Sequence, residues 1–329
     1  MELSYFVFYT IYSIVLIFSL LFLILFFNAT YTFKQKDRIP TIYIYAMILC
    51  NLGVIFVTFV SDVFPVFISK TSYYYFNYTF GEFIILIDSF VYFYPMFLTI
   101  LMVTERVYVI FNPFGRFFSD GKLKWYCLLL AIIPLVFFLI PFFSDCAANY
   151  NFYLLNYVNA CDPQEHILTY FCDTYSGLIP ISCMFLNICL IGHLHFKRRK
   201  FQSKRATCQS LTSTNASLIK TSVSKARQSH ERTLLIQSIS TTTFLLIFEI
   251  TEHITDIFID HYLSFSDLTR RIIFYSRTGA VALTCFSIYF IGTPAIRRII
   301  IDRAQELIHG KKKMNTIKVL KSRDTSAAS

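Results

Sequence analysis

Long apolar stretches, separated by charged or turn-rich breaks, dominate the hydrophobic pattern of this chain. A bilayer core of about 30 Å needs roughly 20 apolar residues, because a helix rises about 1.5 Å per residue. Seven stretches reach that length. We therefore predict an all-α membrane protein, a seven-transmembrane helix bundle with spans at about residues 4–27, 41–67, 80–108, 125–143, 169–196, 234–259 and 272–291.

Composition strengthens this prediction. Of the 329 residues, 55% are hydrophobic and only 15% are charged, whereas an average soluble domain is about a quarter charged. The chain therefore lacks the polar residues needed to cover a water-facing globule. The 37 Phe and 22 Tyr also exclude disorder, collagen and coiled coils.

The distribution of Lys and Arg orients the predicted spans. Loops 1–2, 3–4 and 5–6 together with the tail hold 26 basic residues, and the opposite loops hold three, Lys70, Arg270 and Arg271. Basic loops stay on the cytoplasmic side, so we predict an extracellular N-terminus and a cytoplasmic C-terminus. The net charge of +10 then indicates attraction to anionic membrane lipids, and it does not indicate nucleic-acid binding.

Two further segments follow the predicted bundle domain, residues 1–293. Apolar residues recur at helical spacing after Pro294 beside several arginines, which predicts an amphipathic helix over 294–308 lying parallel to the membrane. Residues 309–329 read as a flexible basic cytoplasmic tail. The basic inner loop 197–233 lacks apolar residues for a core, so we predict a flexible linker there as well.

The outer loop between spans four and five carries the candidate modification chemistry. Cys146, Cys161 and Cys172 fall at or near the oxidising outer face, where one disulfide can form and one cysteine is left over. Asn77 lies in an outer Asn-x-Thr sequon and is a glycosylation candidate. No metal-ligand or nucleophile–base set occurs at a usable spacing, so we predict neither a cofactor, nor a metal site, nor an enzyme.

Ionisable residues inside the spans are the candidate ligand site, because each costs about 2.5–3.5 kcal/mol near mid-bilayer and is expected to face the bundle interior. Four acids and one arginine fall in the outer half, which favours a small cationic or hydrogen-bond-donating ligand. The alternative is a water-filled polar network that stabilises packing, with ligand contacts made by Tyr92, Phe93 and other aromatics. The candidate ligand-binding residues are Asp88, Tyr92, Glu249, Glu252, His253, Asp256 and Arg277.

The inner end of span three carries the residues Thr104-Glu105-Arg106-Val107, with Pro113 seven residues beyond Arg106. With seven spans and a basic third inner loop, this pattern resembles rhodopsin-like G-protein-coupled receptors. The Phe/Tyr-rich chain with very short ends looks most like a nematode serpentine chemoreceptor, and the sequence does not indicate a subfamily. The resemblance implies a plasma-membrane or sensory-cilium receptor for odorants and a heterotrimeric G protein as partner.

By that resemblance, Arg106 engages the G protein in the active state, Glu105 holds Arg106 in the inactive state, and Glu231 of the third inner loop is counted with the coupling surface. Amine-binding receptors of the rhodopsin-like family also keep an Asp eighteen residues before the Arg, which is the position of Asp88. The chain departs from the family elsewhere. Span three begins without the usual bridging Cys, and Thr293-Pro294 stands where the family has Asn-Pro.

The sequence therefore predicts a chemosensory receptor that binds a small molecule in the outer half of the bundle and activates a G protein. One rival is a ligand-gated cation channel of the insect odorant-receptor kind, which predicts an N-terminus inside. A small-molecule transporter is a second rival, although transporters usually show internal repeats or paired broken helices.

Overall fold

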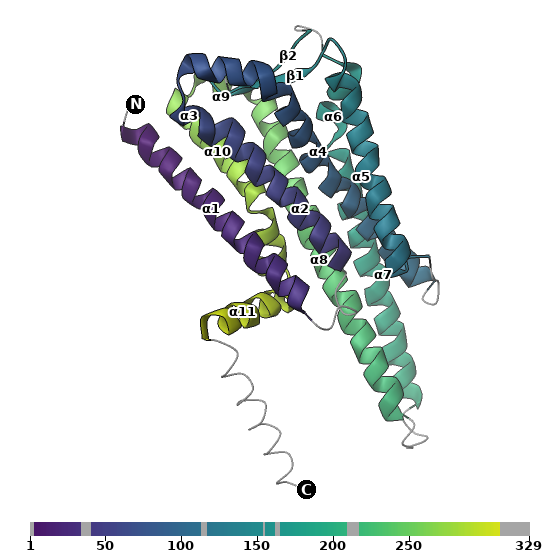
Figure 1. The fold of residues 1–329 in the computed structure, drawn as a ribbon. Coiled ribbons are helices and arrows are strands. Elements are labelled where there is room, and N and C mark those ends of the chain that lie inside the picture. Colours follow the sequence, from purple (N-terminus) through teal and green to yellow (C-terminus); the bar gives the residue numbers. More distant parts are fainter. Residues whose placement is uncertain are drawn as a thin grey trace.

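The structure, a computed structural model, describes residues 3–33, 41–112, 117–153, 155–161, 165–208 and 217–309, without the side chains of residues 3, 4, 120, 197–234, 256 and 309. Long helices run side by side as a bundle, and a small hairpin covers one end (Figure 1). The elements are α1 (Leu3–Thr32), α2 (Thr41–Thr58), η2 (Phe59–Val63), α3 (Phe64–Phe67), α4 (Lys70–Phe111), α5 (Asp120–Phe142), β1 (Ala148–Asn151), β2 (Asn156–Asn159), α6 (Ile167–Tyr175), α7 (Leu178–Cys208), α8 (Ser217–Ile257), α9 (Ile259–Ser264), α10 (Asp267–Ala282), η3 (Phe286–Ile291) and α11 (Pro294–His309).

The helical membrane bundle predicted from the sequence is confirmed. Among the described residues, five helical segments are long and apolar enough to cross a membrane by length and composition. The sixth and seventh predicted spans correspond to α8 and to α10 with η3. Polar residues between Gln237 and Thr243 lower the hydrophobicity of α8. Helix α10 is only 16 residues long and carries three arginines. The count of seven spans thus stays a prediction.

The outward faces of the bundle are apolar, as a lipid-facing surface requires. On α1, the side chains of Ile14, Leu21 and Ile24 are about 60% exposed, whereas Leu16 and Phe26 on the opposite face are buried in the core. Helix α4 lies at the centre of the bundle and contacts α2, α5, α7 and α8. Residues on α4 therefore reach both the outer and the inner ends of the core.

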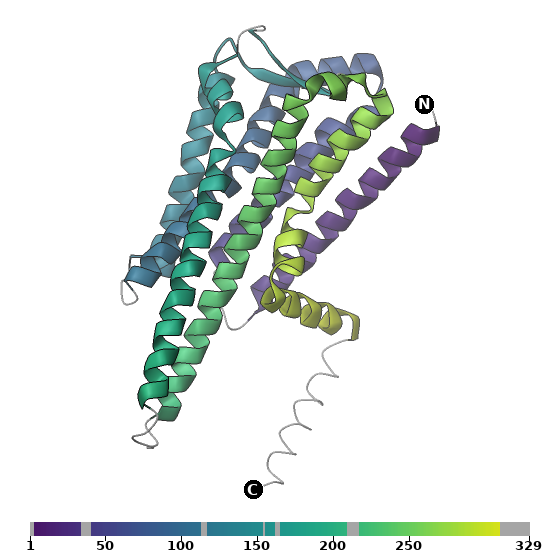
Figure 2. The same cartoon turned by 180° about the vertical axis from the view of Figure 1, so that it is seen from behind.

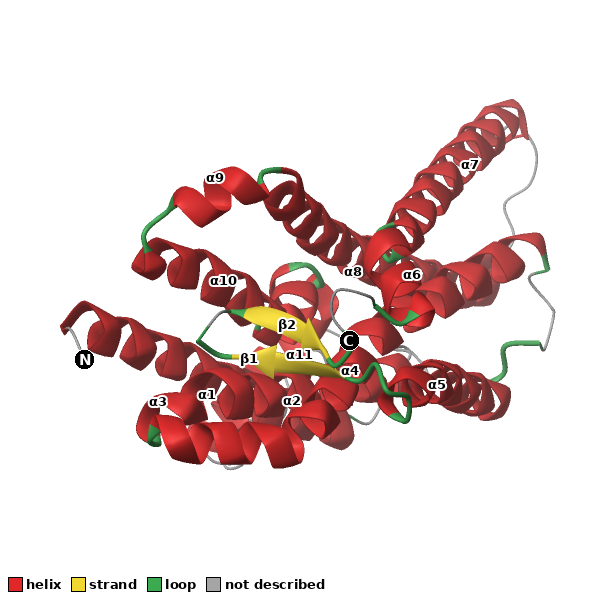
Figure 3. Ribbon diagram, turned by 90° about the horizontal axis from the view of Figure 1, so that it is seen from above, coloured by secondary structure: helices red, strands yellow, loops and turns green. Residues whose placement is uncertain are grey.

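Strands β1 and β2 form an antiparallel hairpin over the end of the bundle that we call outer, following the orientation predicted from the basic loops (Figure 3). This hairpin was not predicted. Asn149 of β1 fits against Gly81 of α4, where an added Cβ would lie 2.1 Å from the Asn149 amide oxygen. The Asn149 amide nitrogen also donates to the Asn77 carbonyl oxygen at 3.1 Å. A glycine at position 81 thus lets the hairpin rest directly on α4.

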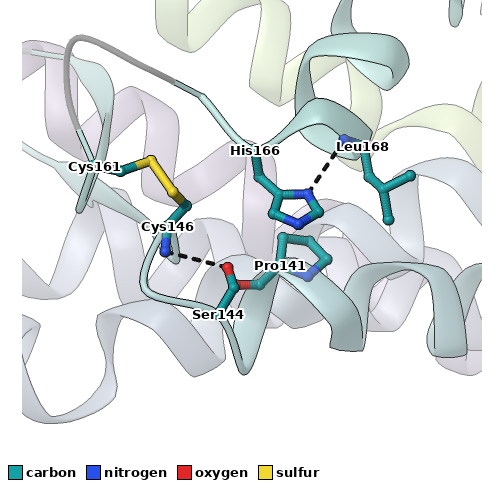
Figure 4. The surroundings of a disulfide bond; sticks show 6 residues. All are labelled: Pro141, Ser144, Cys146, Cys161, His166 and Leu168. Atoms are coloured by element: carbon teal, nitrogen blue, oxygen red, sulfur yellow. Dashed lines mark hydrogen bonds between the residues drawn. A yellow bond between two sulfur atoms is a disulfide. The ribbon is translucent and has the colours of Figure 1, made fainter.

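The disulfide joins Cys146 to Cys161 and closes the base of the hairpin (Figure 4). Cys172 of α6 is the cysteine left over, and its thiol is free and buried. The backbone N–H of Cys146 donates to the Ser144 hydroxyl, which fixes the chain at the end of α5. Of the three candidates, the structure therefore pairs the two that flank the hairpin.

The fifth predicted span is broken between α6 and α7, at Ser176 and Gly177. Pro180 lies in the first turn of α7 and lacks the N–H that would continue the helical ladder from α6. An added Cβ at Gly177 would lie 3.1 Å from the imidazole Nε2 of His253 and 3.5 Å from a carboxylate oxygen of Glu249. The small residue at this break therefore allows close approach to α8.

A second break separates α10 from η3, and a side chain of α2 bridges it. The Asn51 amide donates to the Ala282 carbonyl oxygen at 2.7 Å and accepts from the Cys285 N–H at 3.0 Å. Ser19 of α1 also donates to the Ala282 carbonyl oxygen. Backbone groups freed by the break are thereby paired, as the membrane interior requires.

Helices α7 and α8 project together beyond the inner end of the bundle (Figure 2). The backbone is helical up to Cys208 and again from Ser217, so the structure differs from the flexible linker predicted for 197–233. Elongating an existing helix is far easier than nucleating a new one. The Lys-, Arg- and Gln-rich sequence also favours a helix once the spans have started it.

Helix α11 follows Pro294 and crosses the end of α1 (Figure 1). Ile296 and Ile300 are 2% exposed and pack into the core, and Arg303 donates to the Asn28 side-chain oxygen at 2.9 Å. Contact with the membrane along its length stays a prediction. The tail predicted for 309–329 lies, apart from residue 309, outside the described residues.

Candidate functional site

The outer half of the bundle brings five of the predicted ligand-binding residues together, from α4, α8 and α10. Tyr92 of α4 donates its hydroxyl proton to the carboxylate of Glu249 on α8. Glu252, one turn further along α8, forms an ion pair with Arg277 of α10, with 3.6 Å between Oε1 and Nη2. We call Asp88, Tyr92, Glu249, Glu252 and Arg277 the outer cluster.

Asp88 is joined to this cluster from the hairpin side. The hydroxyl of Tyr157, on β2, donates to a carboxylate oxygen of Asp88 at 3.1 Å. Since Asp88 lies one turn before Tyr92 on α4, the hairpin is tied to the helix that carries the outer cluster. Hairpin and cluster therefore form one connected unit.

Glu249 is the most deeply buried acid of the outer cluster, with a relative exposure of 1%. In addition to Tyr92, the Ser176 hydroxyl donates to its Oε2 atom at 2.7 Å. Ser176 lies at the break between α6 and α7, so Glu249 links three helical elements. Two hydroxyl donors therefore satisfy the hydrogen bonding of this buried carboxylate.

Arg277, unlike Glu249, is only partly matched by hydrogen-bonding partners. Its guanidinium lies over the aromatic rings of Phe248 and Phe274, at 5.5 and 6.0 Å from the ring centroids. Its ion pair with Glu252 is longer than an ordinary N–H···O hydrogen bond. Among the described residues, the buried Nε atom has no hydrogen-bond partner. Arg277 therefore retains unused donor capacity.

This geometry changes the charge argument made from the sequence. Asp88, Glu249 and Glu252 each have a partner within the protein, so they do not require a ligand cation. His253 lies beside Gly177, and the side chain of Asp256 is outside the described part of the chain. A cationic ligand stays a prediction, but one of its main reasons is removed.

A small chamber of about 30 Å³ lies between α2, α4, α8 and α10. Tyr92 and Phe248 belong to its wall, and these residues contact Glu249 and Arg277, respectively. This volume is enough for about two water molecules and is far below that of ordinary small-molecule pockets. The other lining residues are Met47, Cys50, Asn51, Val54, Val91, Pro95, Phe244, Leu245, Val281 and Thr284.

The inner end of α4 places Arg106 in the core, with a relative exposure of 7%. Among the described residues, neither of its Nη atoms has a hydrogen-bond partner. Glu105 accepts a hydrogen bond from the Tyr43 hydroxyl of α2 at 2.6 Å. The hold of Glu105 on Arg106 that the resemblance implies stays a prediction. The side chain of Glu231 lies outside the described residues.

A network of neutral polar side chains lies in the inner half. Asn187 of α7 donates to Thr242 of α8 at 3.1 Å, and the Ser238 hydroxyl donates to Asn187 at the same distance. Gln237 donates to the Tyr289 hydroxyl of η3 at 3.2 Å. We call these five side chains the inner network. Sequence reasoning missed it, although a polar residue inside an apolar span was the available signal.

A third buried polar group lies near the outer end of α1. The Tyr12 hydroxyl donates to Asp62 at 3.3 Å and lies 2.8 Å from the Thr278 hydroxyl. Asp62, within the second predicted span, is 4% exposed. No group of three or more metal-ligating side chains was found among the described residues.

Two comparisons with known proteins show what the chain is similar to. Residues 38–188 match the family described as Caenorhabditis serpentine receptor-like protein, class xa. The expected resemblance to nematode serpentine receptors is confirmed, and the matching family model is that of class xa. The chain is also 26% identical, over 295 residues, to serpentine receptor class XA 10 of Caenorhabditis elegans, covering 87% of each protein.

The similarity supports a membrane protein of the chemoreceptor kind. The proteins that the chain resembles are described as receptors, which agrees with the prediction that it is not an enzyme. Asn77, the glycosylation candidate, lies in α4 with its side chain partly buried. Its modification stays a prediction.

Proposed function

We propose that the chain is a chemosensory G-protein-coupled receptor that binds a small molecule at the outer cluster and activates a heterotrimeric G protein at its inner end. The observation that carries the proposal is that α4 joins both candidate sites. Asp88 and Tyr92 belong to the outer cluster, and Arg106 lies buried about four turns further along the same helix. The receptor similarity over most of the chain supports the same function.

The proposed mechanism is a shift between two populations of the bundle. An agonist that binds the active arrangement more tightly than the inactive one raises the population of the active state. The breaks at Ser176–Gly177 and between α10 and η3 are positions where the helical ladder is already interrupted. Bending at Ser176–Gly177 would move the inner end of α7 together with the part of α8 packed against it, and expose Arg106 to the G protein.

The proposal places the receptor in the plasma membrane, with the N-terminus outside and the C-terminus inside. The excess of basic residues in alternate loops supports this orientation. An epitope tag at the N-terminus should therefore be labelled on intact cells. Labelling only after permeabilisation would favour a channel of the insect odorant-receptor kind instead.

Replacing Arg106 tests the coupling role. Cells that express the chain with a promiscuous G protein would be screened with a chemical panel, and the agonists found would be tested again on Arg106→Ala. We expect agonist-dependent signalling to be lost at equal surface expression. Thr104→Ala, an exposed position on the same turn, is the matched control and should signal normally. Normal signalling by Arg106→Ala would contradict the proposed mechanism.

A further inference from the structure

A second cavity, of about 70 Å³, lies between α4, α5, α6 and strand β1, and we call it the hairpin cavity. Phe93, Phe138 and Cys172 form its floor, and each is at most 9% exposed. They belong to a hydrophobic cluster separate from the main core. Glu82 and Asp173 also line the cavity but are exposed, so they lie at its mouth. No residue of the outer cluster lines this cavity.

The size of the hairpin cavity limits what can occupy it. A cavity needs roughly 15 Å³ for each water molecule. The hairpin cavity therefore holds four or five groups of that size, about twice as many as the chamber beside Tyr92. A ligand of about four non-hydrogen atoms fits inside, and a larger one must extend through the mouth.

The charge at the mouth favours a cation. Exposed carboxylates are ionised at neutral pH, and none of the residues that line the cavity is a lysine, an arginine or a histidine. His166, at the start of α6, accepts a hydrogen bond at Nδ1 from the Leu168 N–H at 3.2 Å. Because a charged imidazole has no acceptor, this ring is neutral and does not offset the two acids.

The floor determines the kind of cation. The rings of Phe93 and Phe138 lie with their centroids 5.0 Å apart and their planes inclined by 49°. Aromatic faces attract cations, and sites built from several rings bind organic ammonium ions. An inorganic cation such as Ca²⁺ needs six or more oxygen ligands, whereas the floor offers rings and a thiol. Mouth and floor together therefore suit a cation that carries apolar carbons.

We propose that the hairpin cavity binds a small organic ammonium ion. Its charged nitrogen lies at Glu82 and Asp173, and the carbons attached to the nitrogen pack against Phe93 and Phe138. The site is additional to the outer cluster and does not depend on the proposed function. Such an ammonium group can belong to a free amine or to the headgroup of a choline or ethanolamine lipid, because the cavity lies at the outer end of the bundle.

Three probes of four non-hydrogen atoms each test the charge of the ligand: isopropylammonium, 2-propanol and acetate. Binding to the full-length chain in lipid nanodiscs would be measured by saturation-transfer NMR titrations. We expect isopropylammonium to bind with a millimolar Kd, since so few atoms allow no more, and at least about tenfold more tightly than the other two. Equal binding of the three probes, or tighter binding of acetate, would overturn the inference.

Replacing the acids locates the charged end of the ligand. Glu82→Gln/Asp173→Asn should weaken isopropylammonium binding about tenfold, to the level of 2-propanol, because each exposed ion pair contributes only a few-fold. Asp145→Asn/Glu165→Gln is the matched control, since it removes two exposed acids near the same end that do not line the cavity. An equal loss in both double variants would show a general effect of surface charge and would overturn the site.

Replacing a ring of the floor locates the apolar end. Phe138→Leu keeps an apolar side chain but removes the aromatic face, so isopropylammonium should bind about fivefold more weakly while 2-propanol binds as before. Unchanged 2-propanol binding also shows that the cavity is still folded. Phe143→Leu, at an exposed ring of the same segment that does not line the cavity, should change neither affinity. Full isopropylammonium affinity in Phe138→Leu would contradict the placement against the floor.

The composition of the nanodisc distinguishes the two sources of the ammonium group. The loss of affinity caused by Glu82→Gln/Asp173→Asn would be compared in phosphatidylcholine and in phosphatidylglycerol, whose headgroup has no ammonium. A smaller loss in phosphatidylcholine indicates that lipid headgroups compete for the site, and equal losses indicate a site for free amines. The absence of any loss in either lipid would overturn the inference.

Discussion

The outer cluster and the inner network both join helices inside the bundle, but with different kinds of side chain. The outer cluster uses ionisable side chains, with Glu249 between two donors and Arg277 only partly matched. The inner network uses amides and hydroxyls, in which Asn187 alone links Ser238 and Thr242. Both join several helices in the interior of a bundle whose outer faces are apolar.

The two sets of side chains differ in their electrostatic cost. Neutral hydrogen bonds between helices hold a bundle together at little electrostatic cost. Ionisable groups inside a membrane are expensive, so the carboxylates and the arginine of the outer cluster favour a role beyond packing. The proposed function accordingly gives ligand recognition to the outer cluster and the maintenance of helix contacts to the inner network.

The largest expected effect comes from opening the hairpin that is tied to the outer cluster. Replacing Cys146 and Cys161 by Ser removes a disulfide that spans 15 residues, which should cost about 3 kcal/mol. The melting temperature of the purified receptor should fall clearly, and reductant should reproduce the change in the unmodified chain. Cys189→Ser, at an exposed free thiol, is the control. Equal melting temperatures would show that the hairpin contributes nothing to the stability of the outer half.

An intermediate loss of stability is expected when Glu249, the buried acid that accepts two hydrogen bonds, is replaced. Glu249→Leu leaves the hydroxyls of Tyr92 and Ser176 without their acceptor, so we expect a loss of about 2 kcal/mol. Glu249→Gln keeps an acceptor oxygen and should lose less. The measurement is thermal unfolding in detergent. A Leu variant as stable as the Gln variant would contradict the view that these two hydrogen bonds matter.

The smallest expected effects, two coupling energies, distinguish the outer cluster from the inner network most clearly. Double-mutant cycles should give less than about 1 kcal/mol both for Glu252 with Arg277, which are partly exposed, and for Asn187 with Thr242. Only the first coupling should weaken as salt is raised, because it alone depends on charge. Salt dependence of both couplings, or of neither, would remove the distinction between the outer cluster and the inner network.

The fold could be predicted from the sequence where hydrophobicity decides it. Helices α1 and α5 follow apolar stretches long enough for a bilayer, and α11 begins at Pro294 as predicted. The hairpin could not be predicted, since each strand is only four residues long and Asn156–Asn159 does not alternate between apolar and polar residues. It depends on the disulfide and on contact with Gly81, which are tertiary features.

The candidate site was found only in part, for a related reason. Charged residues in apolar spans stand out in the sequence, and this signal located Asp88, Glu249 and Arg277. Their neutral partners Tyr157 and Ser176 do not stand out, because hydroxyl-bearing residues are common in loops and helices. Without those partners, the acids were counted as unmatched, and the unused donor of Arg277 was not recognised.

The most direct test of the account separates ligand recognition from coupling in one experiment. Binding of an agonist found with the chemical panel, in nanodiscs, and G-protein activation in cells would be measured for Arg277→Met and Arg106→Ala. The account predicts that Arg277→Met loses both activities, whereas Arg106→Ala binds the agonist as tightly as the unmodified chain and activates no G protein. Loss of agonist binding in Arg106→Ala at normal expression, or G-protein activation by that variant, would contradict the proposed assignment of recognition to the outer cluster and coupling to the inner end of α4.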